Sequence, residues 1–255
     1  MTTEENRPAR QDPYALALRT GGGPVYLRLT DGRWTWLPVH RWYAQPTRAD
    51  ETLLERCAGP VLDVGCGPGR LCSALLHQGI FAVGIDVAPR AVARTIALGG
   101  TALCRSVFAP LPGEGAWQTL LLADGNIGIG GDPRALLRRC TQLIAPTGVL
   151  LVEVEQIDVA ERCTAWVEDT HGHRGPPFPW ARLGAPALRR IAAELGLGVT
   201  DEWQGDHRSF LALSPQCTAR GASQPTRDRR SGCEDIGRAP VTNEQGASPD
   251  RGTPP

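Results

Sequence analysis

Between residues 61 and 154 the chain alternates short apolar runs with segments of helical periodicity, and this alternation limits the fold more than any other feature. Buried strands are expected at residues 61–65, 81–86, 102–107, 117–123 and 149–154, and helices at 70–78, 89–98 and 133–144. Strands that are apolar throughout and alternate with helices indicate a mostly parallel sheet covered on both faces. The predicted class is therefore α/β, with a doubly wound sheet.

Shorter elements flank this alternation. Further strands are expected at residues 25–29, 33–37, 199–203 and 208–213, and further helices at 50–58 and 186–195. The last two strands follow each other closely and predict an antiparallel pair that completes a seven-stranded sheet. Residues 157–184 do not follow the strand–helix rhythm, so we expect an inserted hairpin there, with a Gly/His/Pro tip.

These patterns divide the chain into four segments. Residues 214–255 are polar and rich in Pro, Gly, Ser and Arg, and residues 1–12 are polar as well. Such segments bury too little apolar surface to offset their chain entropy, so both are expected to be disordered. Residues 13–49 are expected to form an N-terminal hairpin that is a lid or an edge cover, and residues 50–213 the main domain.

Composition and charge exclude several classes of function. The chain has 27 basic and 27 acidic residues and a formal net charge of zero, which makes a nucleic-acid partner unlikely because phosphate binding needs surplus cations. No apolar run is long enough to span a membrane, and the polar start does not predict a signal peptide. The eight cysteines are scattered and include no CxxC pair. We therefore interpret them as small core residues of a protein in a reducing compartment. We therefore expect a cytoplasmic protein.

The junction of the first expected strand and helix carries the sharpest motif, Asp-Val-Gly-Cys-Gly-Pro-Gly-Arg at residues 63–70. Glycines at this place let the backbone turn tightly and approach a ligand, and the following helix directs free N–H groups at it. Asp86 ends the next strand, where a carboxylate can accept hydrogen bonds from the two hydroxyls of a ribose. The alternative is an ordinary glycine-rich turn with a helix-capping Asp.

The details of the motif favour one kind of adenosine ligand. A dinucleotide fingerprint places its third glycine at position 70, where this chain has Arg70. The acidic Asp63 would repel a pyrophosphate and suits an ammonium group better. Both observations favour adenosine linked to an α-amino acid.

In these residues the sequence resembles the class I S-adenosylmethionine-dependent methyltransferases, a family with a Rossmann-like fold. The resemblance covers about residues 50–155 and, weakly, the final two strands. It implies that S-adenosyl-L-methionine is the cofactor, with Asp63, Gly65 and Gly67 around its methionine part, Asp86 on the ribose and Val87 on the adenine. The implied cofactor positions together are Asp63, Gly65, Cys66, Gly67, Gly69, Asp86, Val87, Ser106, Val107 and Asp124. Family members often have an acid after the third strand for the adenine amino group, whereas this chain has Ser106 there.

The fourth strand leads into a glycine-rich segment, residues 123–133. By resemblance, Asp124 falls where the family's motif IV faces the methyl group, so it is a candidate catalytic residue, and Asn126 a candidate substrate contact. The segment lacks the Asn/Asp-Pro-Pro-aromatic pattern of many methyltransferases that act on amino groups of DNA and proteins. Its four glycines predict either a loop that lies flat against a ligand or a plain linker capped by Asp132.

The insertion adds three candidates. His173 is a candidate general base, since an imidazole can accept a proton near neutral pH, and His171 is a candidate substrate contact. Trp180 is a candidate for an apolar substrate pocket, together with Trp42 and Tyr43, although these rings can equally pack the hairpin and insertion onto the core. No metal site is expected, because the histidine pair has no evident third ligand.

The resulting hypothesis is methyl transfer from S-adenosyl-L-methionine to a small-molecule acceptor through an O, N or C atom. Positioning the acceptor in line with the sulfonium and excluding water would supply most of the catalysis. The alternatives are a catalytically silent cofactor-binding module and, on a related fold, a nicotinamide-dependent oxidoreductase. A monomer or homodimer without membrane partners is expected.

Overall fold

The central element of the computed structural model, which describes residues 12–216, is a seven-stranded sheet in the order β10-β11-β7-β6-β3-β4-β5. Its parallel part comprises β3 (Val61–Val64), β4 (Ala82–Asp86), β5 (Thr101–Cys104), β6 (Trp117–Leu122) and β7 (Ile144–Val154). The antiparallel part comprises β10 (Leu197–Gly205) and β11 (Arg208–Pro215). The predicted α/β class and the C-terminal antiparallel pair are confirmed.

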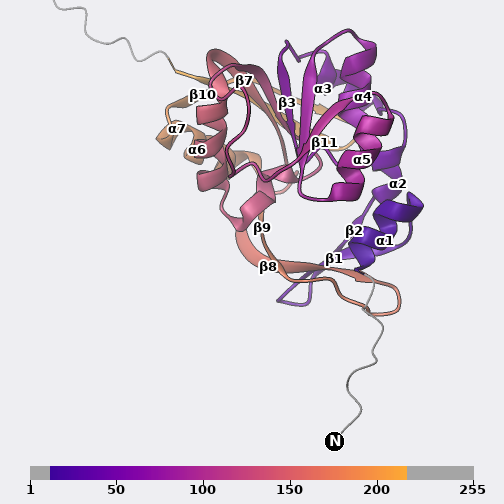
Figure 1. Ribbon diagram of the computed structural model, residues 1–255. Coiled ribbons are helices and arrows are strands. Elements are labelled where there is room, and N and C mark those ends of the chain that lie inside the picture. Colours follow the sequence, from indigo (N-terminus) through magenta and orange to yellow (C-terminus); the bar gives the residue numbers. More distant parts are fainter. Residues whose placement is uncertain (1–11, 217–255) are drawn as a thin grey trace, which may run out of the picture. The chain divides into compact units, whose positions relative to one another are not determined.

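Helices cover both faces of this sheet (Figure 1). One group consists of α3 (Arg48–Leu54), α4 (Arg70–His77) and α5 (Pro89–Ala97). The other group consists of α6 (Pro133–Leu143) and α7 (Ala185–Glu194). Leu53, Leu75 and Leu121 are fully buried in the core on the α3–α4 side, and Leu120 and Leu137 in the core on the α6 side. Strand residues next to each other in sequence, Leu120 and Leu121, therefore bury opposite faces of the sheet, which is why β6 is apolar throughout.

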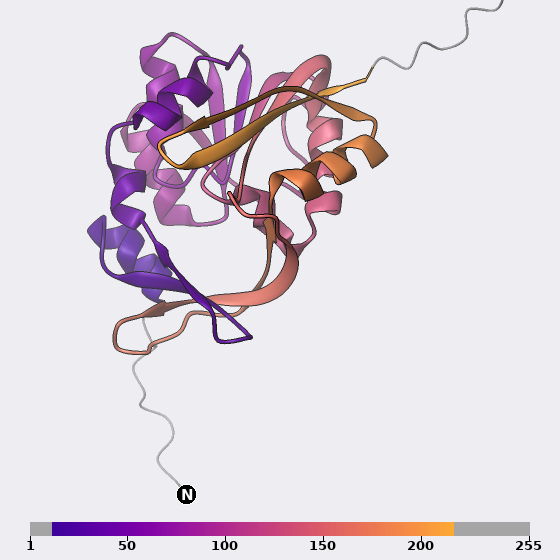
Figure 2. The ribbon, with the colours of Figure 1, turned by 180° about the vertical axis from the view of Figure 1, so that it is seen from behind.

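A second sheet of four strands, β2-β1-β8-β9, lies beside the first (Figure 2). It comprises β1 (Val25–Leu29), β2 (Trp34–Leu37), β8 (Ala160–Asp169) and β9 (Phe178–Leu183). The sequence predicts two separate hairpins, whereas the structure joins them, because β1 pairs with β2 along one edge and with β8 along the other. An isolated two-stranded hairpin is marginally stable in water, so this pairing gives both hairpins the width that they lack alone.

Two helices of the N-terminal segment are absent from the sequence prediction, α1 (Pro13–Thr20) and α2 (Val39–Tyr43). Helix α1 begins with the Asp12 side chain accepting a hydrogen bond from Tyr14 N at 3.1 Å and ends at Gly21, which has a φ of 71°. Its Ala17 packs with Val25, Val39 and Val167 in a small core of its own. The N-terminal segment and the insertion therefore share one apolar core.

Some expectations concern the ends of the chain. Strand β11 continues to Pro215, beyond the end at residue 213 that the sequence predicts, and Asp12 caps a helix rather than belonging to a disordered terminus. The expected disorder of residues 1–11 and 217–255 lies outside the described residues. Among residues 12–216, no helix has the length and apolar character needed to cross a membrane.

Candidate active site

The glycine-rich loop after β3 carries three glycines with positive φ, Gly65 at 74°, Gly67 at 53° and Gly69 at 91°. A Cβ on Gly65 would lie 2.6 Å from the Asn126 amide, and one on Gly69 would lie 2.6 Å from the Thr95 hydroxyl. A Cβ on Gly67 would meet nothing within 4 Å, so this glycine borders open space. The loop therefore combines tight packing at its two ends with an open cradle in the middle.

Asp86, at the end of β4, holds this loop. Its carboxylate accepts hydrogen bonds from Gly67 N at 2.9 Å and from Ala88 N at 2.8 Å. Burial raises the pKa of Asp86, while these backbone N–H groups lower it by a smaller amount. The Asp86 carboxylate therefore holds the loop in place and lies close enough to contact a ligand bound there.

Asp63, in β3 just before this loop, is also buried, with 2% of its surface exposed. The Cys72 thiol donates to its Oδ2 at 3.4 Å. Burial raises the pKa of Asp63 to about 7, opposed by this hydrogen bond and by the charge of Arg70. A partly neutral buried acid of this kind gains from a cationic ligand group, which would favour its ionised form.

A cavity of about 460 Å³ joins the glycine loop to the second sheet. One part of its wall comes from the carboxyl ends of β3, β4 and β6 and from the loop after β5, as is usual for ligand sites of open α/β sheets. The other part comes from the N-terminal segment and the insertion. Its apolar and aromatic side chains include Tyr14, Leu27, Trp42, Val167, Phe178 and Trp180.

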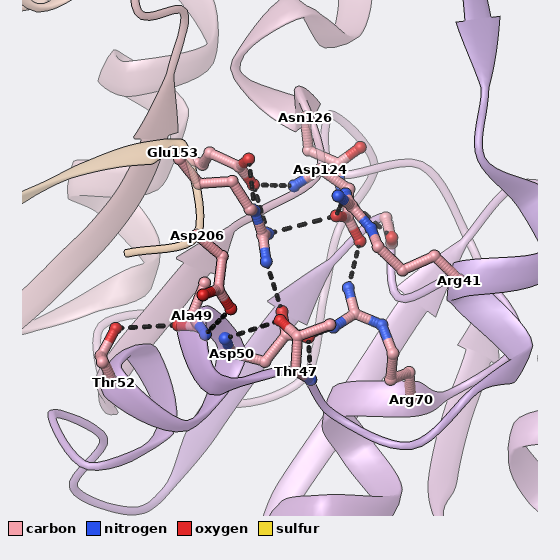
Figure 3. A network of polar contacts seen from close by, with 12 residues as sticks. Arg41, Thr47, Ala49, Asp50, Thr52, Arg70, Asp124, Asn126, Glu153 and Asp206 are labelled. Atoms are coloured by element: carbon pink, nitrogen blue, oxygen red, sulfur yellow. Dashed lines mark hydrogen bonds and ion pairs between the residues drawn. The ribbon is translucent and has the colours of Figure 1, made fainter. Parts of the chain in front are cut away.

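Asp124, two residues after the end of β6, is at the centre of a network of buried and partly buried charges (Figure 3). Its backbone has a positive φ of 54°, and its N–H donates to Glu153 at 2.5 Å. Its Oδ2 accepts a hydrogen bond from Arg70 at 2.5 Å, and its Oδ1 accepts from Arg41 and, at 3.2 Å, from Arg208. Both oxygens of this carboxylate are therefore engaged by guanidinium groups.

Three arginines and three acids balance one another in this network. Arg208 donates to Glu153 at 2.6 and 2.7 Å and to Asp50 at 2.6 Å, and Asp50 also pairs with Arg70. Asp50 is fully buried and belongs to the capping box of α3 with Thr47. Because each charge in the network has an opposite partner, the network neutralises itself and Asp124 does not present a free anion to the cavity.

The glycines after Asp124 lie in a short 3₁₀ helix, Asn126–Gly131. A Cβ on Gly128 would lie 2.2 Å from the Ala181 carbonyl oxygen, and one on Gly131 would lie 2.8 Å from Pro179. Both glycines therefore allow close packing against β9. Neither predicted interpretation of this segment included this packing, although Asp132 does cap α6 by accepting a hydrogen bond from Ala135 N at 3.1 Å, as the linker interpretation predicts.

Most of the predicted site residues line the cavity. Every predicted cofactor position except Gly69 does so, as do Asn126, Trp180 and Trp42. His171, His173 and Tyr43 do not. The side chains of His171 and His173 are 79% and 54% exposed at the tip of the insertion, and His173 Nδ1 lies 2.8 Å from Asp169 Oδ2. The structure thus does not bring the two histidines to the reaction site, because β8 carries the tip beyond the cavity wall.

Sequence reasoning missed the wall residues Tyr14, Leu27, Val167 and Phe178. The alternation Val25, Leu27, Leu29 signals an apolar strand face, but only the pairing with β8 gives that face its position. Similarly, nothing local in the sequence brings Arg41, Asp50, Glu153 and Arg208 to Asp124.

Residues 62–152 match the family model described as a methyltransferase domain. Over these residues the chain is similar to methyltransferase domains, in agreement with its predicted resemblance to the class I S-adenosylmethionine-dependent methyltransferases. The glycine cradle, the anchoring Asp86 and the enclosed Asp63 fit an amino acid joined to adenosine, as in the predicted cofactor S-adenosyl-L-methionine. The match disfavours the predicted alternative of a nicotinamide-dependent oxidoreductase.

Solved structures share the fold of this methyltransferase at low identity. A SAM-dependent methyltransferase from Bacteroides fragilis in complex with S-adenosyl-L-homocysteine has a TM-score of 0.69 and 21% identity, over 82% of this chain and 97% of that one. The CcbJ methyltransferase from Streptomyces caelestis has a TM-score of 0.52 and 15% identity, over 69% and 92%. The sugar N-methyltransferase KedS8 from Streptoalloteichus sp. has a TM-score of 0.50 and 16% identity, over 85% and 98%. No curated protein matches the sequence significantly.

Proposed function

We propose that this methyltransferase acts on a small molecule with a largely apolar, ring-containing body. The observation that carries the proposal is the wall of the cavity opposite the glycine loop. Tyr14 and Trp42 meet edge to face there, with ring centroids 6.4 Å apart, and Phe178 and Trp180 do the same at 6.0 Å. Apolar and aromatic walls of this kind recognise an acceptor by burying its apolar surface.

The cradle half of the cavity is assigned to the cofactor. We propose that Asp63 faces the α-ammonium group and that Asp86 accepts from the ribose hydroxyls. Val87, Ser106 and Val107 would enclose the adenine. When bound, S-adenosylmethionine supplies an electrophilic methyl group on its sulfonium. The protein then has to hold the acceptor in line with that methyl group and to exclude water.

Asp124 is proposed as a positioning residue and not as a general base. A base needs a free lone pair within reach of the acceptor's proton, and three arginines already donate to this carboxylate. Its left-handed backbone and its hydrogen bonds from Arg70 and Arg41 instead hold the part of the cavity wall that contains Asp124 in place. Methyl transfer here would depend on proximity, so the acceptor should already be nucleophilic, as a neutral amine or an ionised oxygen is.

Binding of the cofactor product tests the first half of the proposal. Calorimetric titration of S-adenosylhomocysteine into the full chain should give binding that is lost in Asp86→Ala and kept in Asp158→Asn, a change at an exposed acid. Binding that is unchanged in Asp86→Ala would remove this acid from the cofactor site.

Turnover tests the second half. With labelled methyl donor, aromatic amines and phenols should accept the methyl group, whereas sugars and polyols should not. Trp180→Ala should raise the KM for such an acceptor about tenfold through the lost aromatic contact. Trp34→Ala is the matched control, since Trp34 is 59% exposed and does not line the cavity. Turnover with polyols alone would overturn the assignment of an apolar acceptor.

A further inference from the structure

The tip of the insertion brings three metal-ligand side chains together outside the cavity. Strand β8 ends at Asp169, and the chain reverses so that Asp169 N donates to the His173 carbonyl oxygen at 3.1 Å and Gly172 N donates to the Asp169 carbonyl oxygen at 3.1 Å. Gly172 has a φ of 78°, which allows the tight reversal. As a result, the side chains of Asp169, His171 and His173, here called the tip triad, gather at one place.

The distances within the tip triad suit a small cation. Asp169 Oδ2 lies 2.8 Å from His173 Nδ1 and 4.0 Å from His171 Nδ1, and one ligand atom from each residue lies within 4.8 Å of the others. Ligands that are about 2.0–2.2 Å from a zinc ion are roughly 3–4 Å apart, so small side-chain rotations would complete the geometry. Both histidines are exposed, so these rotations and the entry of an ion are unobstructed.

The charges around the tip triad favour a cation. The Asp169 carboxylate accepts hydrogen bonds from the backbone N–H groups of His171 at 2.8 Å and His173 at 2.9 Å through Oδ1, while its Oδ2 faces the two imidazoles. The nearby Arg174 donates to Glu168 at 2.7 Å and stacks over Trp166 at 4.7 Å. Its positive charge is therefore already paired with another acid.

We propose that the tip triad binds one divalent transition-metal ion of the zinc class. Two imidazoles and one carboxylate suit Zn²⁺, Co²⁺ or Ni²⁺ better than the hard ions Mg²⁺ and Ca²⁺, which prefer oxygen ligands. Neutral His173 would carry its proton on Nε2 so that Nδ1 can coordinate, and water would complete the coordination. None of the three residues lines the cavity, so this site is distinct from methyl transfer. The ion would brace the end of β8, two residues beyond the wall residue Val167.

Cobalt binding tests this site in the full chain. Titration with CoCl₂ alone should give one bound ion whose visible absorption has the form of nitrogen and oxygen ligands, and ZnCl₂ should displace it. His171→Ala and His173→Ala should each weaken binding on the order of tenfold or more. His77→Ala, which removes an exposed imidazole from α4, is the matched control and should leave the affinity unchanged.

The spectrum also separates this site from thiols. Cys104 is exposed, and two further cysteines lie outside the described residues. A cobalt spectrum with thiolate charge-transfer bands, or an affinity that is the same in His171→Ala, His173→Ala and the wild type, would overturn the proposal. Because these changes lie away from the cavity, S-adenosylhomocysteine binding by the same variants reports on the proposed function independently.

Discussion

Asp63→Asn removes a buried carboxyl whose ionisation the folded protein resists. Asp63 is 2% exposed, and burial is the largest cause of the rise of its pKa from 3.8 to about 7. Because a shift of one unit corresponds to about 1.4 kcal/mol, ionised Asp63 costs the fold about 4 kcal/mol at a pH well above 7. Asn has nearly the same shape and cannot ionise, so it removes this cost.

The sign of the pH dependence follows from the direction of the shift. The folded chain holds the Asp63 proton more tightly than the unfolded chain does, so this group's contribution to the free energy of unfolding falls as the pH rises from about 4 to about 7. Between pH 5 and pH 8 the wild type should lose about 2–3 kcal/mol through this group. The other titrating groups are common to both proteins and cancel in the comparison.

Urea unfolding of both proteins without ligand, at several pH values from 5 to 8, measures this effect. The free energy of unfolding of Asp63→Asn minus that of the wild type should increase by about 2–3 kcal/mol across this range. Asp158→Asn, at an exposed position, should give a nearly constant difference. A difference for Asp63→Asn that stays constant, or that falls with pH, would refute the reasoning from burial.

Two substitutions elsewhere test the packing of the site by the same urea method. Arg208→Gln breaks the buried charge network and should lower the free energy of unfolding by about 3–5 kcal/mol. Arg189→Gln, in an exposed ion pair, is the control and should lower it by less than about 1 kcal/mol. Equal losses in the two variants would contradict the importance of burial. Gly128→Ala places a Cβ 2.2 Å from the Ala181 carbonyl oxygen and should lower the free energy of unfolding by about 1–3 kcal/mol. Gly22→Ala is the control and should change it little, because a Cβ there has nothing within 4 Å. If Gly128→Ala leaves the free energy of unfolding unchanged, the 3₁₀ segment is not packed tightly against β9.

The main sheet and the glycine cradle could be predicted because their signals are local. The apolar run of β6 and the glycines 65, 67 and 69 act within a few residues of where they stand in the sequence. The same holds for Asp86, which ends a strand next to the cradle in the sheet. Parallel strands end at one edge, so residues at successive strand ends meet without any knowledge of distant pairing.

The wall of the cavity opposite the glycine loop and the charge network around Asp124 could not be predicted in this way. Leu27 and Val167 face each other only because β1 and β8 pair across about half the chain, and short strands with several possible partners do not specify that register locally. Arg208 and Asp50 meet across 158 positions for the same reason. The tip triad is an intermediate case, since Asp169 stands only two residues before His171, and attention to that spacing would have supplied the third ligand.

The second sheet combines strands from two distant parts of the chain, and this affects how acceptor specificity can be engineered or can diverge among related proteins. The proposed cofactor contacts come from one contiguous stretch between β3 and the loop after β5, whereas the opposite wall of the cavity comes from two stretches that are far apart in the chain. A chimera that exchanges residues 157–184 alone would leave β1 beside a foreign strand. Transfer of acceptor specificity to another protein should therefore require that residues 13–43 be exchanged together with the insertion.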